Sequence, residues 1–268
     1  MNRAAFYASV RARTSAVFGT SLSQSQVQGV EAVLDEAENR GTSIFHLAAI
    51  LSEIYHETGG QMQPVKETVY ANSKDRNPSD ATVIKRLDTA YAKGQLPWVS
   101  KPYWREGWFG RGLIQITHEE NYRKLGLTKE SALDLQASVR ATFDGMEQGL
   151  FTGKKLSDYD YLITRNPDMP GYKYYNSRAI VNGDTAKNGA MIAGYAVAFE
   201  RALVAAAYSA KKPNLGTAPK ASEASASSET RPDLGTTPTA AIEQGPVPSG
   251  NWLADLLKVL ATLLKGKK

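Results

Sequence analysis

Apolar residues recur at helical spacing through most of the first 210 positions. The run SLSQSQVQGVEAVLDEAENRG, residues 21–41, places four apolar residues on one face and ends at Gly41, a typical helix stop. The next run, SIFHLAAILSEIYHET, repeats this spacing from Phe45 to Ile54. Further helices are expected over 79–94, 129–151 and 185–210. Sustained alternation is hard to find, so the pattern predicts a mainly α domain over residues 1–210 with few, short strands.

One segment differs from this helical pattern. In GRGLIQIT, Gly110 and Gly112 flank Arg111 and predict a tight turn. The residues LIQIT then read as a short strand, on which Gln115 and Thr117 would share a face because side chains two apart point the same way. A hairpin edge with these polar residues in solvent explains the same letters.

The composition changes at residue 211. Residues 211–250 are rich in Ala, Ser, Thr, Pro and Gly and contain no aromatic residue, which indicates a flexible linker. Residues 251–268, NWLADLLKVLATLLKGKK, predict an amphipathic helix with Lys258 and Lys265 opposite its leucines. This helix is too short to span a bilayer, and a cationic helix lying on a membrane surface is one interpretation. Docking on the main domain or on a partner is the other.

Charge and cysteine content exclude several classes of protein. The net charge is +5, but residues 211–268 carry eight basic and five acidic side chains, so the first 210 residues are nearly balanced and nucleic acid is not an expected partner. The absence of cysteine excludes disulfides, Cys-ligated zinc and thiol catalysis. The start of the chain lacks a continuous apolar stretch, so a secretory signal is not expected.

The segment YHETGGQMQPVKET contains two candidate catalytic carboxyl groups, Glu57 and Glu67. Glu57 follows an apolar helix face, where a carboxyl is partly desolvated, and Gly59-Gly60 then ends the helix. Glu67 lies in polar surroundings near Lys66, where it should stay ionised, and two carboxyls in unlike environments suit glycosidic bond cleavage. A helix end followed by a polar loop is the plainer interpretation. A zinc motif is not expected, because the second His of H-E-x-x-H is replaced by Gly60.

A third stretch, YKYYNSRAIVNGD, combines tyrosines with Asn176, Arg178 and Asn182. Aromatic rings beside amides and a guanidinium suit sugar binding, and a tyrosine-rich core edge fits equally well. The tryptophans Trp98, Trp104 and Trp108 extend the same aromatic character.

The order HETGG, FGRGLIQITHEENY and RAIVNGD resembles the family 19 glycoside hydrolases, which are the plant-type chitinases and related phage endolysins with a lysozyme-like fold. The resemblance covers most of residues 40–185 and implies a two-lobed domain. It implies Glu57 as general acid and Thr117 as a residue that helps to hold the attacking water. The residues implied to contact sugar are Gln115, Asn121, Tyr122, Arg178 and Asn182, the last two across the groove.

The second carboxylate departs from one branch of that family. In plant chitinases it lies about twenty residues after the acid, which here is Ser79 beside Asp80. In phage members it lies about ten residues on, which is Glu67, so Glu67 is preferred and Asp75 and Asp80 are reserves. Asp184 stands where the family usually has a second glycine.

The resemblance implies inverting hydrolysis of β-1,4 bonds in peptidoglycan without metal or cofactor, by a monomer. Chitin hydrolysis and lytic transglycosylation are rival activities, and a non-catalytic virion or wall-binding protein is a rival outside enzymology. Synthesis in the cytoplasm, followed by action at the cell wall or periplasm or by carriage in a virion, is the expected localisation.

Overall fold

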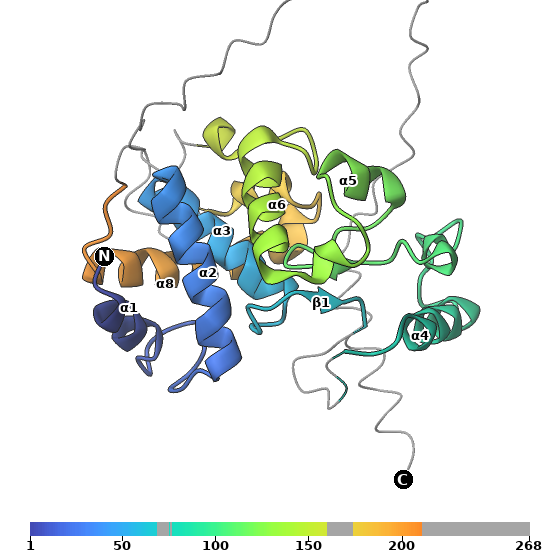
Figure 1. Ribbon diagram of the computed structural model, residues 1–268, viewed down its shortest axis with the longest axis horizontal. Helices are drawn as coiled ribbons and strands as arrows, with labels where there is room; N and C mark the ends of the chain where they lie inside the picture. The colour runs from blue at the N-terminus through green and yellow to red at the C-terminus, as the bar shows by residue number, and fades with distance from the viewer. Residues whose placement is uncertain (69–74, 76, 160–173, 211–268) are drawn as a thin grey trace, which may run out of the picture.

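A computed structural model describes residues 1–68, 75, 77–159 and 174–210 (Figure 1). The expected linker and C-terminal helix therefore lie outside the described residues. The α-helices are α1 (Arg3–Val10), α2 (Gln24–Arg40), α3 (Ile44–Glu57), α4 (Asp80–Ala92), α5 (Glu119–Lys124), α6 (Leu135–Gln148) and α8 (Thr185–Ala205). Short 3-10 helices are η1 (Tyr103–Glu106), η2 (Ser131–Leu133), η3 (Leu156–Tyr159) and η4 (Asn176–Ile180). The prediction of a mainly α fold is confirmed.

Helix boundaries follow the capping residues of the sequence. Ser23 caps α2 in a capping box with Gln26, and the helix ends at Gly41 in the left-handed conformation, as expected. Ser43 accepts a hydrogen bond from the His46 amide at the start of α3. Asp134 caps α6, which therefore begins later than the pattern over 129–151 predicted.

Helix α3 forms the centre of the larger core. It packs chiefly against α8, with α2 and α6 beside it (Figure 1). Its residues Leu47–Leu51 and Ile54 are fully buried, so the helix is shielded around nearly its whole circumference. A helix buried in this way gives its last turn a fixed position, and that turn carries Glu57.

A second, smaller core lies around α4, which stands apart from the main helices in Figure 1. It contains Val83, Leu87, Ala90, Leu96, Trp104 and Phe109. A third cluster is formed by Ile116, Tyr122 and Ala132, and the two larger cores are separate from each other. Strands β1 (Val65–Lys66) and β2 (Arg111–Gly112) lie between them in sequence and pair antiparallel, with Lys66 opposite Arg111.

The expectation of a strand over LIQIT is wrong. Residues 113–115 form a turn that is closed by mutual backbone hydrogen bonds between Arg111 and Ile116, at 3.2 and 2.9 Å. Gln115 has a φ of 51°, in the left-handed region, so the backbone reverses instead of extending. Gln115 and Thr117 consequently do not share a strand face.

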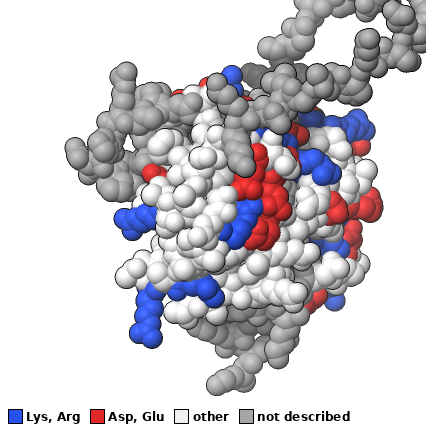
Figure 2. Space-filling model, turned by 60° about the vertical axis from the view of Figure 1, so that its left-hand side comes forward, with Lys and Arg blue, Asp and Glu red and all other residues white. Residues whose placement is uncertain are grey.

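The N-terminus is joined to the far end of the described chain. The Asn2 amide donates to the Ala206 carbonyl at 2.8 Å, and α1 packs on α8. On α2, three acidic side chains surround Arg3, with Glu31 and Asp35 at 2.8 and 2.6 Å from its guanidinium. Figure 2, turned to bring this side forward, shows acidic and basic side chains gathered together on the surface. No helix in the described part of the chain has the length and apolar character needed to cross a bilayer.

Candidate active site

Glu57 is the last residue of α3, and the local sequence fixes it there. The Thr58 hydroxyl bonds back to the Ile54 carbonyl at 2.7 Å and accepts the Met62 amide at 3.0 Å. Gly59 and Gly60 both adopt positive φ, which reverses the chain directly after the helix. The Glu57 residue is 8% exposed, so its carboxyl is mostly desolvated and still reachable from solvent.

Arg178 holds Glu57 from a segment more than a hundred residues away. Its Nη1 donates to Glu57 Oε1 at 2.7 Å and to Glu53 Oε2 at 2.5 Å. Its Nε and Nη2 donate to the two oxygens of Asp184 at 2.6 and 3.3 Å. We call Glu53, Glu57, Asp184 and Arg178 the Arg178 cluster. Within the described residues, Glu57 Oε2 has no hydrogen-bond partner, so one oxygen is anchored and the other is available.

Two of the three carboxyl groups in the Arg178 cluster have shifted pKa values. Burial raises the pKa of Glu53 to about 8, although Arg178 opposes the shift. Burial also acts to raise the pKa of Asp184, but the hydrogen bonds and charge of Arg178 outweigh it, and the pKa lies below its ordinary value. Asn188, one turn into α8, donates to Asp184 at 2.6 Å and supports its charged form.

Glu67 is in a different setting. Its carboxyl accepts from the Gly110 amide at 2.7 Å through Oε2 and from the Tyr103 hydroxyl at 3.1 Å through Oε1. The residue is 0% exposed. Burial raises its pKa to about 8, despite these two hydrogen bonds and the nearby charge of Arg111. The expectation that Glu67 stays ionised in polar surroundings is therefore wrong, because its side chain is buried against the backbone at Gly110.

Gly110 and the turn at residues 113–115 are held by side chains on both sides. Gln115, predicted to contact sugar, is 7% exposed and donates from Nε2 to the carbonyls of Val65 and Gly112 at 2.9 and 3.0 Å. A Cβ at Gly110 would lie 2.9 Å from Gln115 Oε1 and 3.4 Å from Glu67 Oε2, so a larger residue there would have to displace the Gln115 side chain. Gln115 therefore joins the turn to β1, and its Oε1 has no partner among the described residues.

Three other predicted contact residues lie near this turn. Thr117 is half-buried, and its carbonyl accepts from Asn121 Nδ2 at 2.9 Å at the start of α5. Tyr122 is 0% exposed and donates to the Phe109 carbonyl at 2.8 Å. It also accepts a bond from Arg111 at 3.3 Å. Tyr122 thus supports the turn from behind, contrary to the expected sugar contact, because its ring lies inside the small core that it shares with Ile116 and Ala132.

The residues expected on the opposite wall separate into two roles. Arg178 is 1% exposed and faces the carboxylates instead of open space. Asn182 is half-buried, and its backbone amide donates to the Arg178 carbonyl at 3.0 Å. Arg178 therefore holds the Glu57 carboxyl in this arrangement, and the sugar contact of Asn182 stays a prediction.

The reserve carboxylates are exposed and paired. Asp80 lies 2.9 Å from Lys66 Nζ and 2.7 Å from Arg111 Nη2, and so links the two paired strands. Burial acts to raise the pKa of Asp80, but Lys66 and Arg111 outweigh it and lower the pKa. Asp75 lies 3.1 Å from Arg86. Neither carboxylate contacts the Arg178 cluster through a described residue.

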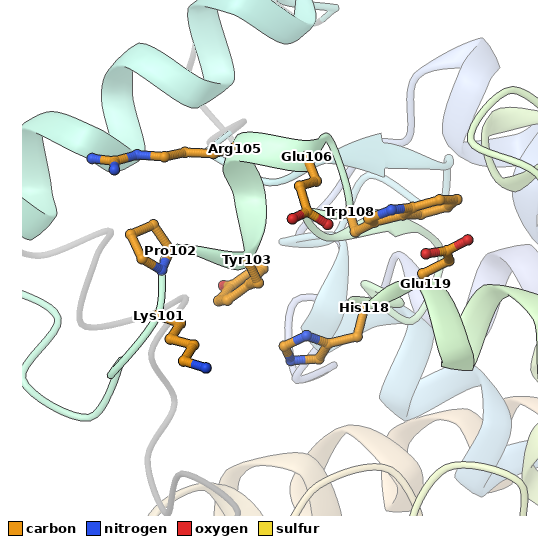
Figure 3. Close-up of a pocket in the computed structure, with 8 residues that line it drawn as sticks. All are labelled: Lys101, Pro102, Tyr103, Arg105, Glu106, Trp108, His118 and Glu119. Carbon is orange, nitrogen blue, oxygen red and sulfur yellow. The ribbon is translucent and has the colours of Figure 1, made fainter.

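A pocket of about 430 Å³ opens beside Tyr103 (Figure 3). The aromatic side chains of Tyr103, Trp108 and His118 line it together with Lys101, Pro102, Arg105, Glu106 and Glu119. The rings of Tyr103 and His118 lie 4.8 Å apart, and the Tyr103 hydroxyl reaches Glu67. Tyr103 is therefore the side chain that connects the pocket with the buried carboxyl of Glu67.

His118 has a strained backbone at the wall of this pocket. Its φ of 65° and ψ of 137° lie in a region that residues other than glycine rarely adopt. The strained residue is held by its amide, which donates to the Trp108 carbonyl at 3.0 Å, and by its carbonyl, which accepts from Asn121 and Tyr122. Burial lowers the pKa of His118 and favours the neutral imidazole. Nowhere in the described ranges do three or more His, Asp or Glu residues form a group able to hold a metal ion.

The sequence interpretation did not single out Glu53, Asp80 as a strand link, or Tyr103. Glu53 could have been found, because it lies four residues before Glu57 on an otherwise apolar face. Comparison with known proteins finds no matching family model, curated protein or solved structure.

Proposed function

We propose that the protein is a glycoside hydrolase that cleaves β-1,4 bonds of peptidoglycan, with Glu57 as the general acid. The observation that carries this proposal is the anchored and partly exposed Glu57 carboxyl. Arg178 holds Oε1 at 2.7 Å, and Oε2 has no described partner. A general acid needs a fixed position, a desolvated carboxyl and one oxygen free to meet the leaving group.

The chemistry follows from that geometry. Glu57 would transfer its proton from Oε2 to the glycosidic oxygen while the bond from that oxygen to the anomeric carbon breaks. Positive charge then develops on the sugar ring, and the negatively charged carboxyls of the Arg178 cluster favour it electrostatically. Water completes hydrolysis at the anomeric carbon, and a base must take its proton.

The pocket of Figure 3 supports a sugar substrate. Trp108, Tyr103 and His118 offer ring faces, and Glu106 and Glu119 offer acceptors for hydroxyl and amide groups. Its volume is large enough for a sugar unit. Chitin presents the same β-1,4 linkage, so product analysis has to separate the two polymers.

Lytic transglycosylation is a second candidate, and the setting of Glu67 favours it. A base must be ionised and must touch the water that it activates, whereas Glu67 is 0% exposed and both of its oxygens accept hydrogen bonds. With a pKa of about 8 it is mostly protonated at neutral pH. Transglycosylation uses an internal hydroxyl of muramic acid as nucleophile, and it needs one acid and no water-activating carboxylate.

The deciding experiment combines one variant with product analysis. Glu57→Gln should reduce release of fragments from purified sacculi by at least about 100-fold, because the amide cannot supply the proton. Glu36→Gln is the matched control, since Glu36 is also held by an arginine, at 2.7 Å from Arg40, and should retain full activity. Near-wild-type activity of a folded Glu57→Gln protein would exclude Glu57 as the acid.

Mass spectrometry of the wild-type products then separates the reactions. Reducing-end muramic acid indicates hydrolysis, and anhydro-muramic acid indicates transglycosylation. Chitooligosaccharides from a parallel chitin digestion would indicate a chitinase. Binding to sacculi without any release would favour a non-catalytic wall-binding protein.

A further inference from the structure

We propose that Glu53 is a positioning residue for the general acid: it shares Nη1 of Arg178 with Glu57 and holds the proton that keeps the Arg178 cluster assembled. The proposal rests on the proposed function, since it concerns how Glu57 is held ready for proton transfer. It assigns a role to a buried acid that the reaction itself does not use.

The geometry places the two glutamates on one donor. Glu53 and Glu57 lie one turn apart on α3 and project toward the same guanidinium nitrogen, at 2.5 and 2.7 Å. The two hydrogens of Nη1 can serve one carboxyl each. The other side of the guanidinium is occupied by Asp184 at 2.6 Å. A change in the charge of Glu53 therefore alters the hydrogen bond of Glu57, because both carboxyls bind Nη1 of Arg178.

Charge balance requires a proton in the cluster. Three carboxyls from α3 and from the start of α8 face the single cation of η4, and full ionisation would leave two uncompensated negative charges in a buried space. Among the described residues, His56 also lies near the cluster, and burial lowers its pKa, so it does not add a second cation at neutral pH. With Glu57 carrying the proton that it transfers, one further carboxyl must be neutral to balance the single cation.

Glu53 is the carboxyl best placed to stay neutral. It is 1% exposed, and its Oε1 is a buried atom without a partner in the described residues, so ionisation there is stabilised only by Arg178. Its raised pKa, about 8, agrees with this assignment. Asp184, by contrast, receives three hydrogen bonds and is held ionised.

The consequence is a limit to activity on the alkaline side. While Glu53 is neutral, Asp184 balances the charge of Arg178, and Nη1 holds Glu57 Oε1 so that the transferable proton lies at Oε2. When Glu53 ionises, it competes for Nη1 with a full negative charge, and the anchor of Glu57 weakens. Activity should therefore fall as pH rises through about 8, with Glu53 acting through Arg178 and not on the substrate.

Glu53→Gln tests this, because the amide oxygen can accept the same bond but cannot ionise. At pH 6 the variant should release fragments from sacculi within about 3-fold of the wild type, and its alkaline limit should move up by about one pH unit or more. Glu36→Gln should leave the profile unchanged. A Glu53→Gln profile that superimposes on the wild type through pH 9 would overturn the proposal.

A second readout does not depend on activity. Carbon-13 NMR of glutamate side-chain carboxyls should show two groups that titrate above pH 7 in the wild type, Glu53 and Glu67. Glu67→Gln should remove one and leave the other, and Glu53→Gln should remove the remaining one. If Glu67→Gln leaves no carboxyl that titrates above pH 7, Glu53 does not hold the proton.

The two proposals fail in different ways. If Glu57→Gln is inactive while Glu53→Gln leaves the alkaline limit unchanged, the positioning role alone is wrong. If Glu57→Gln is fully active, the proposed acid is wrong, and the NMR titration then reports only the charge state of the cluster.

Discussion

The two glutamates predicted to work together, Glu57 and Glu67, are held by opposite kinds of partner. Glu57 ends a helix, lies against a buried cation and keeps one oxygen without a described partner. Glu67 is fully enclosed, and neutral donors, a backbone amide and a phenol, occupy both of its oxygens. The cation Arg178 fixes the Glu57 carboxyl through one oxygen and leaves the other without a described partner. The neutral donors bind both oxygens of Glu67, which thereby braces the backbone at Gly110 against Tyr103.

The largest effect that would test this difference is the loss of the cation. Arg178→Met should destabilise the fold by about 3–5 kcal/mol, because three buried carboxyls lose their counter-charge together. Urea unfolding at pH 7 measures this change.

Arg40→Met is the matched control for that experiment. Arg40 also binds three acids, Glu36, Asp144 and Glu147, but in a partly exposed setting. Its loss should therefore cost about 1 kcal/mol or less. Equal losses for the two arginines would mean that the Arg178 cluster is no more dependent on its cation than a surface network.

A smaller, pH-dependent effect is expected at Glu67. Its pKa is raised in the folded state, so its contribution to stability is complete below its unfolded pKa and is lost as pH rises through about 8. Glu67→Gln removes this loss. The melting temperature of the variant should therefore rise relative to that of the wild type between pH 5 and pH 8.

Thermal scans at several pH values measure that difference. Glu106→Gln, in the neighbouring 3-10 helix and exposed, should show no such trend. A constant difference between Glu67→Gln and the wild type at all pH values would show that Glu67 is ionised throughout, as a water-activating base would be.

The smallest effect is expected from loss of the Tyr103 hydroxyl. Tyr103→Phe removes the hydrogen bond to Glu67 Oε1, which lowers the pKa of that carboxyl, so the pKa should rise further. Stability should fall by about 1 kcal/mol. The NMR titration of Glu67 measures the first effect, and Tyr91→Phe, which loses a long exposed bond to Ser100, is the control. A lower Glu67 pKa in Tyr103→Phe would contradict the bracing role.

The helices could be predicted because their signals are local. Apolar spacing, the serine caps and Gly41 all act within a few residues, and the structure places α2, α3 and α4 where the sequence indicated. The turn at residues 113–115 could not be predicted from the apolar letters of LIQIT. Its shape is set by backbone bonds between Arg111 and Ile116 and by Gln115 reaching β1, fifty positions earlier.

The site was predicted in position more than in role. Glu57 is at a helix end beside Arg178 and Asp184, but the sequence cannot show that Arg178 turns inward toward it across more than a hundred residues. The ionisation of Glu67 was also misjudged, since polar neighbours in sequence, such as Lys66, do not guarantee solvent around the carboxyl. Lys66 in fact turns to Asp80.

The hydrogen bond between Asn2 and Ala206 has a practical consequence for engineering. Because the two ends of the described domain meet there, a short peptide could join them and new ends could be opened in an exposed loop, such as the one around Gly153. A fluorescent label before Met1 would likewise lie next to the end of α8.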